Sequence, residues 1–125
     1  MSKENVEAQV IRALDDIMDD AFRSRKPSIG RLATVQSIVD LGEGWHGYRE
    51  IQKRLQSFLV TGSVFSFQLV ARYPTIFERE GDSVRIAPGA FHVVVKHIGP
   101  RLAKVKKELS RRNSAGGLLN PSSSL

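Results

Sequence analysis

The sequence predicts a mainly α-helical protein whose helices are interrupted by one small β-hairpin. Apolar residues recur every three or four positions over residues 3–24, 29–41 and 48–59, which is the spacing of helices with one buried face. Over residues 77–86 apolar and polar residues instead alternate on either side of a Gly-Asp pair, which is typical of two short antiparallel strands. A chain of 125 residues is long enough for one hydrophobic core of this kind.

The composition is that of a globular chain without cysteine. Hydrophobic residues make up 41% of the sequence and charged residues 26%, so a packed core is expected. The lack of cysteine excludes disulfide bonds and thiolate metal sites. No apolar run is long enough to span a bilayer, and the opening MSKENVEAQV lacks the apolar core of a secretion signal. We therefore expect a protein of the cytoplasm or nucleus with no membrane partner.

Residues 1–26 predict an amphipathic helix that packs on the core of the protein. Its apolar stripe consists of Val6, Val10, Leu14, Ile17 and Ala21. Ser2 is expected to cap the first turn, and Pro27 and Ser28 are expected to separate this helix from the next one.

Residues 27–98 are expected to form the central domain. Its first helix ends before Gly42, because the three glycines of GEGWHG predict a turn. Trp45 in this turn is expected to fold back onto the core. The next helix begins at Tyr48 and is expected to end near Gly62.

A short helix is expected to follow, capped by Ser63 and ending at about Arg72. Pro74 prevents its extension, since the residue before a proline is pushed out of the helical region. The apolar residues that this segment is expected to bury are Phe65, Leu69 and Val70 or their neighbours.

The predicted hairpin turns at Gly81 and Asp82, and this turn sets the register of the two strands. The expected pairs are Phe77 with Ile86, Glu78 with Arg85, Arg79 with Val84 and Glu80 with Ser83. The inner face then holds Phe77, Val84, Ile86 and the stem of Arg79, while Glu78 and Arg85 form an opposite-charge pair on the outer face.

Basic charge gathers toward the C-terminal end of the chain. Residues 99–112 carry six basic side chains and one acidic side chain, within a chain whose net charge is +6. They are expected to form a basic helix that begins at Pro100. Residues 91–98 before it allow helix or strand, with helix favoured, and residues 113–125 are expected to be a disordered tail. Such charge asymmetry suggests a polyanionic partner, and a simple solvated helix face is the alternative.

Three helices followed by a hairpin, over residues 28–87, are the components of a winged helix-turn-helix. The predicted protein is thus a winged helix with a two-stranded β-hairpin wing and extra N- and C-terminal helices. The residues Gly62, Phe65, Leu69, Pro74, Ile76 and Phe77 lead into the charged stretch EREGDSVRI. This pattern resembles LOTUS-type winged-helix domains, and it is also similar to the end of the plant organellar RNA-recognition domain called PORR. The resemblance to LOTUS domains implies binding of RNA or docking of a DEAD-box RNA helicase.

The chain offers little support for catalysis. Residues 15–20, DDIMDD, contain the Asp-Asp-x-x-Asp spacing with which prenyl-diphosphate synthases hold magnesium. Those enzymes need a larger helical cavity and a second acidic motif, so a solvated helix face is the favoured interpretation. His46, His92 and His97 lack the spacing of a zinc site. No nucleophile motif or phosphate-binding loop is present, and we expect no enzyme activity, cofactor or metal.

The expected function is nucleic-acid binding, with RNA favoured over DNA. In a winged helix the third helix of the module commonly enters a groove, and the wing touches the backbone. The expected contacts on the short helix, the wing and the basic C-terminal helix are Ser63, Ser66, Gln68, Arg72, Arg79, Arg85, Lys104, Lys107 and Arg111. The alternative is a protein–protein docking module or a homo-oligomerising adaptor with no nucleic-acid ligand.

Overall fold

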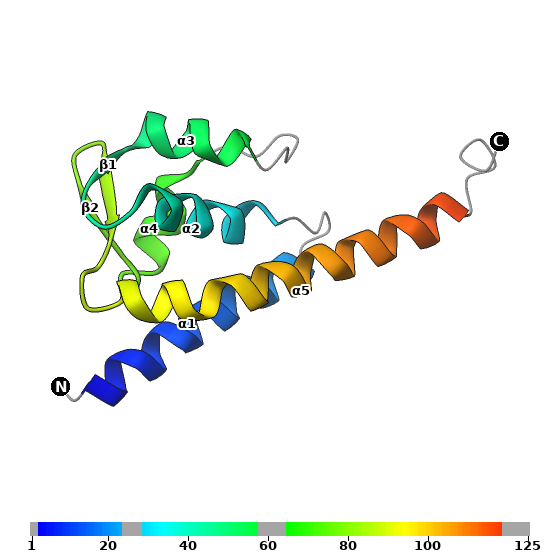
Figure 1. Cartoon of the computed structure of the whole chain (residues 1–125), viewed down its shortest axis with the longest axis horizontal. Coiled ribbons are helices and arrows are strands. Elements are labelled where there is room, and N and C mark those ends of the chain that lie inside the picture. Colours follow the sequence, from blue (N-terminus) through cyan, green and yellow to red (C-terminus); the bar gives the residue numbers. More distant parts are fainter. Residues whose placement is uncertain (1–2, 24–28, 58–64, 119–125) are drawn as a thin grey trace.

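The fold is mainly helical and includes one small antiparallel sheet (Figure 1). The computed structural model describes residues 3–23, 29–57 and 65–118. Its elements, in chain order, are α1 (Lys3–Arg23), α2 (Gly30–Leu41), β1 (His46–Gly47), α3 (Tyr48–Gln56), α4 (Phe67–Arg72), β2 (Phe77–Glu80), β3 (Ser83–Ile86) and α5 (Phe91–Leu118). The predicted mainly α-helical fold is therefore confirmed.

The helices α1, α2 and α5 contact one another and enclose most of the core. α3 packs on α2, and the hairpin closes the end of the core nearest the start of α5 (Figure 1). Each element contributes apolar side chains because its buried positions recur with helical or strand spacing. The largest fully buried side chains are Leu14, Ile17, Leu32, Ile38, Ile51, Leu55, Ile76 and Ile98. The expected stripe of α1 is confirmed at Val10, Leu14, Ile17 and Ala21.

The glycine-rich segment after α2 forms a turn, as predicted, and then a strand that was not predicted. Gly42 and Gly44 have φ angles of 99° and 100°, which favour glycine over residues with a side chain. The turn leads into β1, which pairs antiparallel with β3. The prediction that Trp45 folds back onto the core is wrong, because its side chain remains 39% exposed.

α4 is shorter than expected and begins at a different cap. Ser66 has extended backbone angles, and its hydroxyl oxygen accepts a hydrogen bond from the backbone N–H of Gln68 at 3.1 Å. The expected cap, Ser63, lies outside the described residues, as does any continuation of α3 toward Gly62. The predicted burial of Phe65, Leu69 and Val70 is confirmed.

The hairpin has the predicted register. Phe77 pairs with Ile86, Glu78 with Arg85, Arg79 with Val84 and Glu80 with Ser83. Gly81 adopts a φ of 61° in the turn, the left-handed conformation that glycine reaches without strain. The sheet order is β1-β3-β2, so β3 is the central strand.

α5 corrects the expected division of the C-terminal region. It is one helix from Phe91 to Leu118 with Pro100 inside it, so no boundary lies at residue 99 and the tail expected from Asn113 starts within the helix. Proline removes one helical hydrogen bond. Gly99 and Pro100 lie on the exposed side of α5, where water can replace that bond. The buried stripe of Val94, Ile98, Leu102 and Val105 continues past the proline and holds the helix on the core.

The remainder of the expected tail, residues 119–125, lies outside the described residues. Figure 1 shows that the later part of α5 projects beyond the body of the molecule. Within the described residues, no helix combines the length and the apolar character needed to cross a lipid bilayer.

Candidate nucleic-acid interface

The first turn of α4 meets the hairpin at a contact between an arginine and an aromatic ring. The guanidinium carbon of Arg79 lies 3.7 Å from the ring centroid of Phe67. This is a stacking distance, and the pair gains both dispersion and the attraction of a cation for a π system. The Nε of Arg79 also donates a hydrogen bond to the carbonyl oxygen of Gly81 at 2.7 Å, which ties the side chain to the hairpin turn.

Tyr48 extends this contact toward α3. Its ring centroid lies 6.1 Å from that of Phe67, and Phe67 in turn makes an edge-on contact with Phe65 at 5.2 Å. The backbone N–H of Tyr48 donates to the carbonyl oxygen of Asp82 at 2.9 Å, so the start of α3 is joined directly to the hairpin tip. Tyr48 and Phe67 are both half-buried, which fixes the rings while leaving part of each accessible.

Arg49 completes the group. Its guanidinium carbon lies 5.7 Å from the ring centroid of Tyr48, and its Nε donates to the Tyr48 hydroxyl oxygen at 3.2 Å. This hydrogen bond raises the pKa of Arg49 above its ordinary value. The cluster formed by Tyr48, Arg49, Phe67 and Arg79 is called the aromatic–arginine surface below.

Two predicted contact residues border the aromatic–arginine surface. Ser66 and Gln68 flank Phe67 in the sequence, and both are exposed. The hydroxyl oxygen of Ser66 accepts the hydrogen bond that caps α4, and its hydroxyl hydrogen can still donate a hydrogen bond to a ligand. The structure therefore brings together three of the expected contacts, namely Ser66, Gln68 and Arg79.

Arg85 lies on the opposite face of the sheet. Its guanidinium forms the expected ion pair with Glu78, with 2.6 Å between Nη2 and Oε1. Its guanidinium carbon is also 4.5 Å from the ring centroid of Trp45. Because neighbouring residues of a strand point to opposite faces, Arg85 and Arg79, whose strand partner is Val84, lie on different faces of the sheet.

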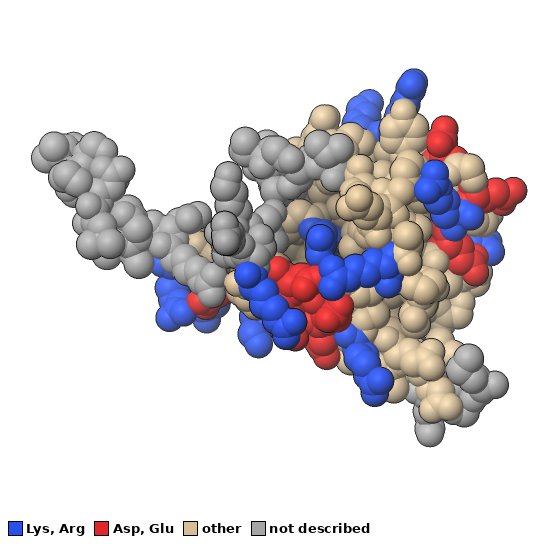
Figure 2. All heavy atoms as spheres, turned by 180° about the vertical axis from the view of Figure 1, so that it is seen from behind, with Lys and Arg blue, Asp and Glu red and all other residues tan. Residues whose placement is uncertain are grey.

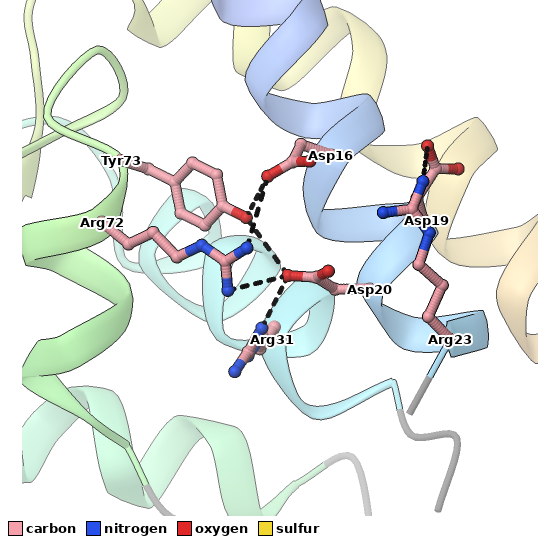
Figure 3. A network of polar contacts seen from close by, with 7 residues as sticks. All are labelled: Asp16, Asp19, Asp20, Arg23, Arg31, Arg72 and Tyr73. Atoms are coloured by element: carbon pink, nitrogen blue, oxygen red, sulfur yellow. Dashed lines mark hydrogen bonds and ion pairs between the residues drawn. The ribbon is translucent and has the colours of Figure 1, made fainter. Parts of the chain in front are cut away.

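Arg72 belongs to a network of polar contacts at the other end of α4 (Figure 3). Its guanidinium nitrogens lie 3.0 Å from Asp20 Oδ2 and 3.9 Å from Asp16 Oδ2. Arg31 of α2 approaches the same Asp20 oxygen at 2.9 Å. The carboxylates of Asp16 and Asp20 on α1 thus bind α2 and the end of α4. Their negative charges largely offset the positive charge of Arg72. We call Asp16, Asp20, Arg31, Arg72 and Tyr73 the acidic clamp.

Tyr73 is the buried member of the acidic clamp. Its hydroxyl donates to Asp16 Oδ2 at 2.6 Å and lies 3.5 Å from Asp20 Oδ2 (Figure 3). Burial, followed by the hydrogen bond to Asp16, raises the pKa of the Tyr73 hydroxyl well above its ordinary value. The phenol therefore remains a neutral hydrogen-bond donor at physiological pH.

The acidic stretch at residues 15–20 is partly solvated, as expected from its sequence, since Asp15, Asp16 and Asp19 are about half exposed, but its carboxylates also pair with arginines. Asp15 pairs with Arg101 at 2.7 Å, and Asp19 lies 3.9 Å from Arg23. The side chain of Asp20 is only 18% exposed. Figure 2, which views the molecule from behind, shows one group of acidic side chains near the middle of this face with basic side chains around it, and a second acidic group near the right edge.

The histidines are dispersed rather than clustered. The Nε2 of His46 in β1 contacts the Gly42 carbonyl oxygen at 2.8 Å, while His92 and His97 lie on α5. Within the described ranges, no group of three or more histidine, aspartate or glutamate side chains is placed to hold a metal ion.

Lys104, Lys107 and Arg111 share one side of α5, because they follow one another at helical spacing. All three are exposed, and Arg111 pairs with Glu108 at 2.6 Å. They lie on the part of α5 that leads away from the hairpin (Figure 1). They form a second basic region apart from the aromatic–arginine surface. Ser63 lies outside the described residues.

Sequence reasoning missed Tyr48, Arg49 and Phe67 as candidate contacts. Tyr48 and Phe67 have helical spacing from buried neighbours and therefore resemble ordinary core residues. A signal was available for Tyr48, which was expected to be the first residue of its helix, where a side chain often lies at the rim of the core. Phe67 offered no such signal, because its helix was expected to begin after Ser63.

Comparison of the chain with known protein families, with curated proteins and with solved structures found no match.

Proposed function

We propose that this chain is a non-enzymatic winged-helix protein that binds nucleic acid, with RNA favoured over DNA. In this assignment α2, α3 and α4 are the three helices of the module, β2 and β3 are the wing, and α1 and α5 are additions. The order of the elements and the register of the hairpin support the assignment.

The observation that carries the proposal is the aromatic–arginine surface at the junction of α3, α4 and the hairpin. Arg49 and Arg79 are exposed cations held against aromatic rings, and in the described part of the chain neither forms an ion pair with a carboxylate. Such cations are free to meet phosphates, and Ser66 and Gln68 beside them supply hydrogen-bonding groups.

The other predicted contacts have lesser roles in this proposal. Arg72 and Arg85 are engaged by carboxylates, so an incoming phosphate would have to compete with an existing partner. Lys104 and Lys107 supply additional phosphate contacts along α5 for a longer strand, and Arg111 does so in competition with its partner Glu108. Ser63 remains a proposed contact. The preference for RNA rests on the resemblance of residues 62–86 to LOTUS-type and PORR domains, and an RNA helicase is a proposed protein partner on the same basis.

A fluorescence anisotropy titration tests the proposal. Labelled RNA and DNA oligonucleotides are titrated with the protein at about 50 mM and about 150 mM salt, and binding is expected to be measurable and weaker at the higher salt. Arg79→Glu is expected to weaken binding, and Lys104→Glu, which changes the charge equally on α5, is expected to weaken it less. Absence of binding at the lower salt would exclude the proposed function.

A second function is favoured by one specific observation. Trp45, which precedes β1 and lies beside Arg85, is 39% exposed, and aromatic residues of this kind are enriched at protein interfaces. The alternative is a docking module for a protein partner or another copy of the chain. Apolar docking tolerates the change in salt that weakens phosphate contacts, so the same titration series, repeated with the partner, separates the two functions.

A further inference from the structure

We propose that the aromatic–arginine surface binds an unpaired strand, with bases stacked on its flat groups, and discriminates against duplexes. This inference rests on the proposed function and names the class of nucleic acid that it takes. Three independent features of the described residues support it: the stacking groups, the charge of the hairpin and the dimensions of α4.

The first feature is the chemistry of the surface. Its groups are two aromatic rings and two guanidinium planes, with Arg79 in contact with Phe67 and Arg49 close to Tyr48. Bases of single strands expose their faces and stack on aromatic rings and on arginine planes. In a duplex those faces are already stacked on neighbouring base pairs, so a surface of flat groups gains nothing from them.

The second feature is the charge of the hairpin. Residues 77–86 contain two arginines and three carboxylates, so the hairpin is net negative. One of the arginines, Arg85, is paired with Glu78 on the outer face. A wing that lies along a duplex approaches the phosphates of both strands, and Glu80 and Asp82 at the exposed tip would repel them. A single strand brings only its own phosphates past the tip, so it meets less of this repulsion than a duplex does.

The third feature is the length and attachment of α4. The helix has six residues, which corresponds to about 9 Å. Its C-terminal end is held to α1 through Arg72 and Tyr73, so it is not free to move outward into a groove. The major groove of A-form RNA is moreover too deep and narrow for such a helix to read.

The order of affinities distinguishes this inference from the proposed function. The full chain is titrated with a labelled RNA of mixed sequence of about 12 nucleotides, and with the same RNA annealed to its complement. We expect the single strand to bind at least about tenfold more tightly than the duplex. With two uncompensated arginines at the surface, a plot of log K against log salt should have a slope of about −1.4 for the single strand.

Matched variants locate the binding. Phe67→Leu keeps an apolar residue but removes the stacking ring, and is expected to reduce single-strand affinity about fivefold to tenfold. Trp45→Leu makes the same kind of change on the opposite face of the sheet and is expected to leave the affinity unchanged. Thermal unfolding followed by circular dichroism verifies that both variants fold. If Phe67→Leu does not fold, Tyr48→Leu replaces it as the variant that removes an aromatic ring from the surface.

The outcomes are separable. Equal or tighter binding of the duplex would overturn the unpaired-strand inference and leave the proposed function standing. Loss of affinity in Trp45→Leu but not in Phe67→Leu would overturn the assignment to this surface. Failure of both oligonucleotides to bind at low salt would overturn the proposed function together with the inference.

Discussion

Arg72 is the last residue of α4, and Arg79 of β2 lies against Phe67 at the start of α4; the two arginines carry the same guanidinium group in different surroundings. Arg72 faces two carboxylates of α1 in the acidic clamp. Arg79 lies on the ring of Phe67, and within the described residues it forms no ion pair with a carboxylate. The comparison shows that the position of an arginine beside the expected wing does not tell whether its charge is paired with a carboxylate; its three-dimensional partners do.

The largest expected effect concerns the acidic clamp. Asp20→Ala removes the carboxylate shared by Arg31 and Arg72, and we expect a loss of about 2 kcal/mol in the free energy of unfolding, because Asp20 is largely buried while its partners are half exposed. Urea denaturation measures it. Asp19→Ala is the control and is expected to change the free energy of unfolding little, since Asp19 is 51% exposed and lies 3.9 Å from Arg23. An equal loss of unfolding free energy in both variants would contradict the role of the acidic clamp.

A pair of matched substitutions sharpens the comparison itself. Arg79→Gln is expected to lower single-strand affinity about fivefold with unchanged stability, because it removes a stacked cation from the surface. Arg72→Gln is expected to lower stability and to leave the affinity of the folded protein unchanged. Anisotropy and urea denaturation on both variants give the two readouts, and the reverse pattern would show that the two arginines have been assigned the wrong roles.

Tyr73 makes the stability of the clamp depend on pH. Its pKa is raised in the folded protein above the ordinary value of 10.0. As pH rises above about 10 the unfolded chain loses the phenol proton first, so stability falls toward the pKa of the folded state. At pH 8, Tyr73→Phe is expected to lower the free energy of unfolding by about 1 kcal/mol. The variant lacks the phenol and therefore does not lose stability through its ionisation, so the difference in unfolding free energy between the unsubstituted protein and the variant should be smaller at about pH 11. Urea denaturation at both values tests it, and a constant difference would contradict it.

The smallest expected effect is that of the outer face of the hairpin. Glu78→Gln removes the cross-strand pair with Arg85, and we expect a loss of about 0.5 kcal/mol in the free energy of unfolding. The same change releases Arg85 from its carboxylate. We expect the single-strand affinity of Glu78→Gln to stay nearly unchanged. A marked increase would show that Arg85 on the outer face contributes to binding, and would contradict the assignment of binding to the face that carries Arg79.

The parts of the fold that depend on local sequence were predicted well. The register of the hairpin followed from the position of Gly81 and Asp82, because a two-residue turn leaves one alignment of the strands. The buried stripe of α1 followed from spacing alone.

The parts that depend on distant residues were not predicted. Asp16 and Tyr73 are 57 positions apart, and nothing in either segment specifies the other as its partner. Without that pairing, Arg72 looks like a free cation of the short helix. β1 was missed for a similar reason, because two residues carry no alternation and the strand exists only through its pairing with β3. Pro100 resembled a helix start because the sequence does not show which side of α5 faces solvent.

The most direct test of the aromatic–arginine surface is a nuclear magnetic resonance titration. Isotope-labelled protein is titrated with unlabelled single-stranded RNA, and backbone amide shifts are followed residue by residue. We expect the largest shifts at Tyr48 and Arg49, at Phe67 and Gln68, and at Arg79 to Asp82, with small shifts along α1. Shifts confined to the outer face around Trp45 and Arg85, or to α5 beyond Pro100, would contradict it.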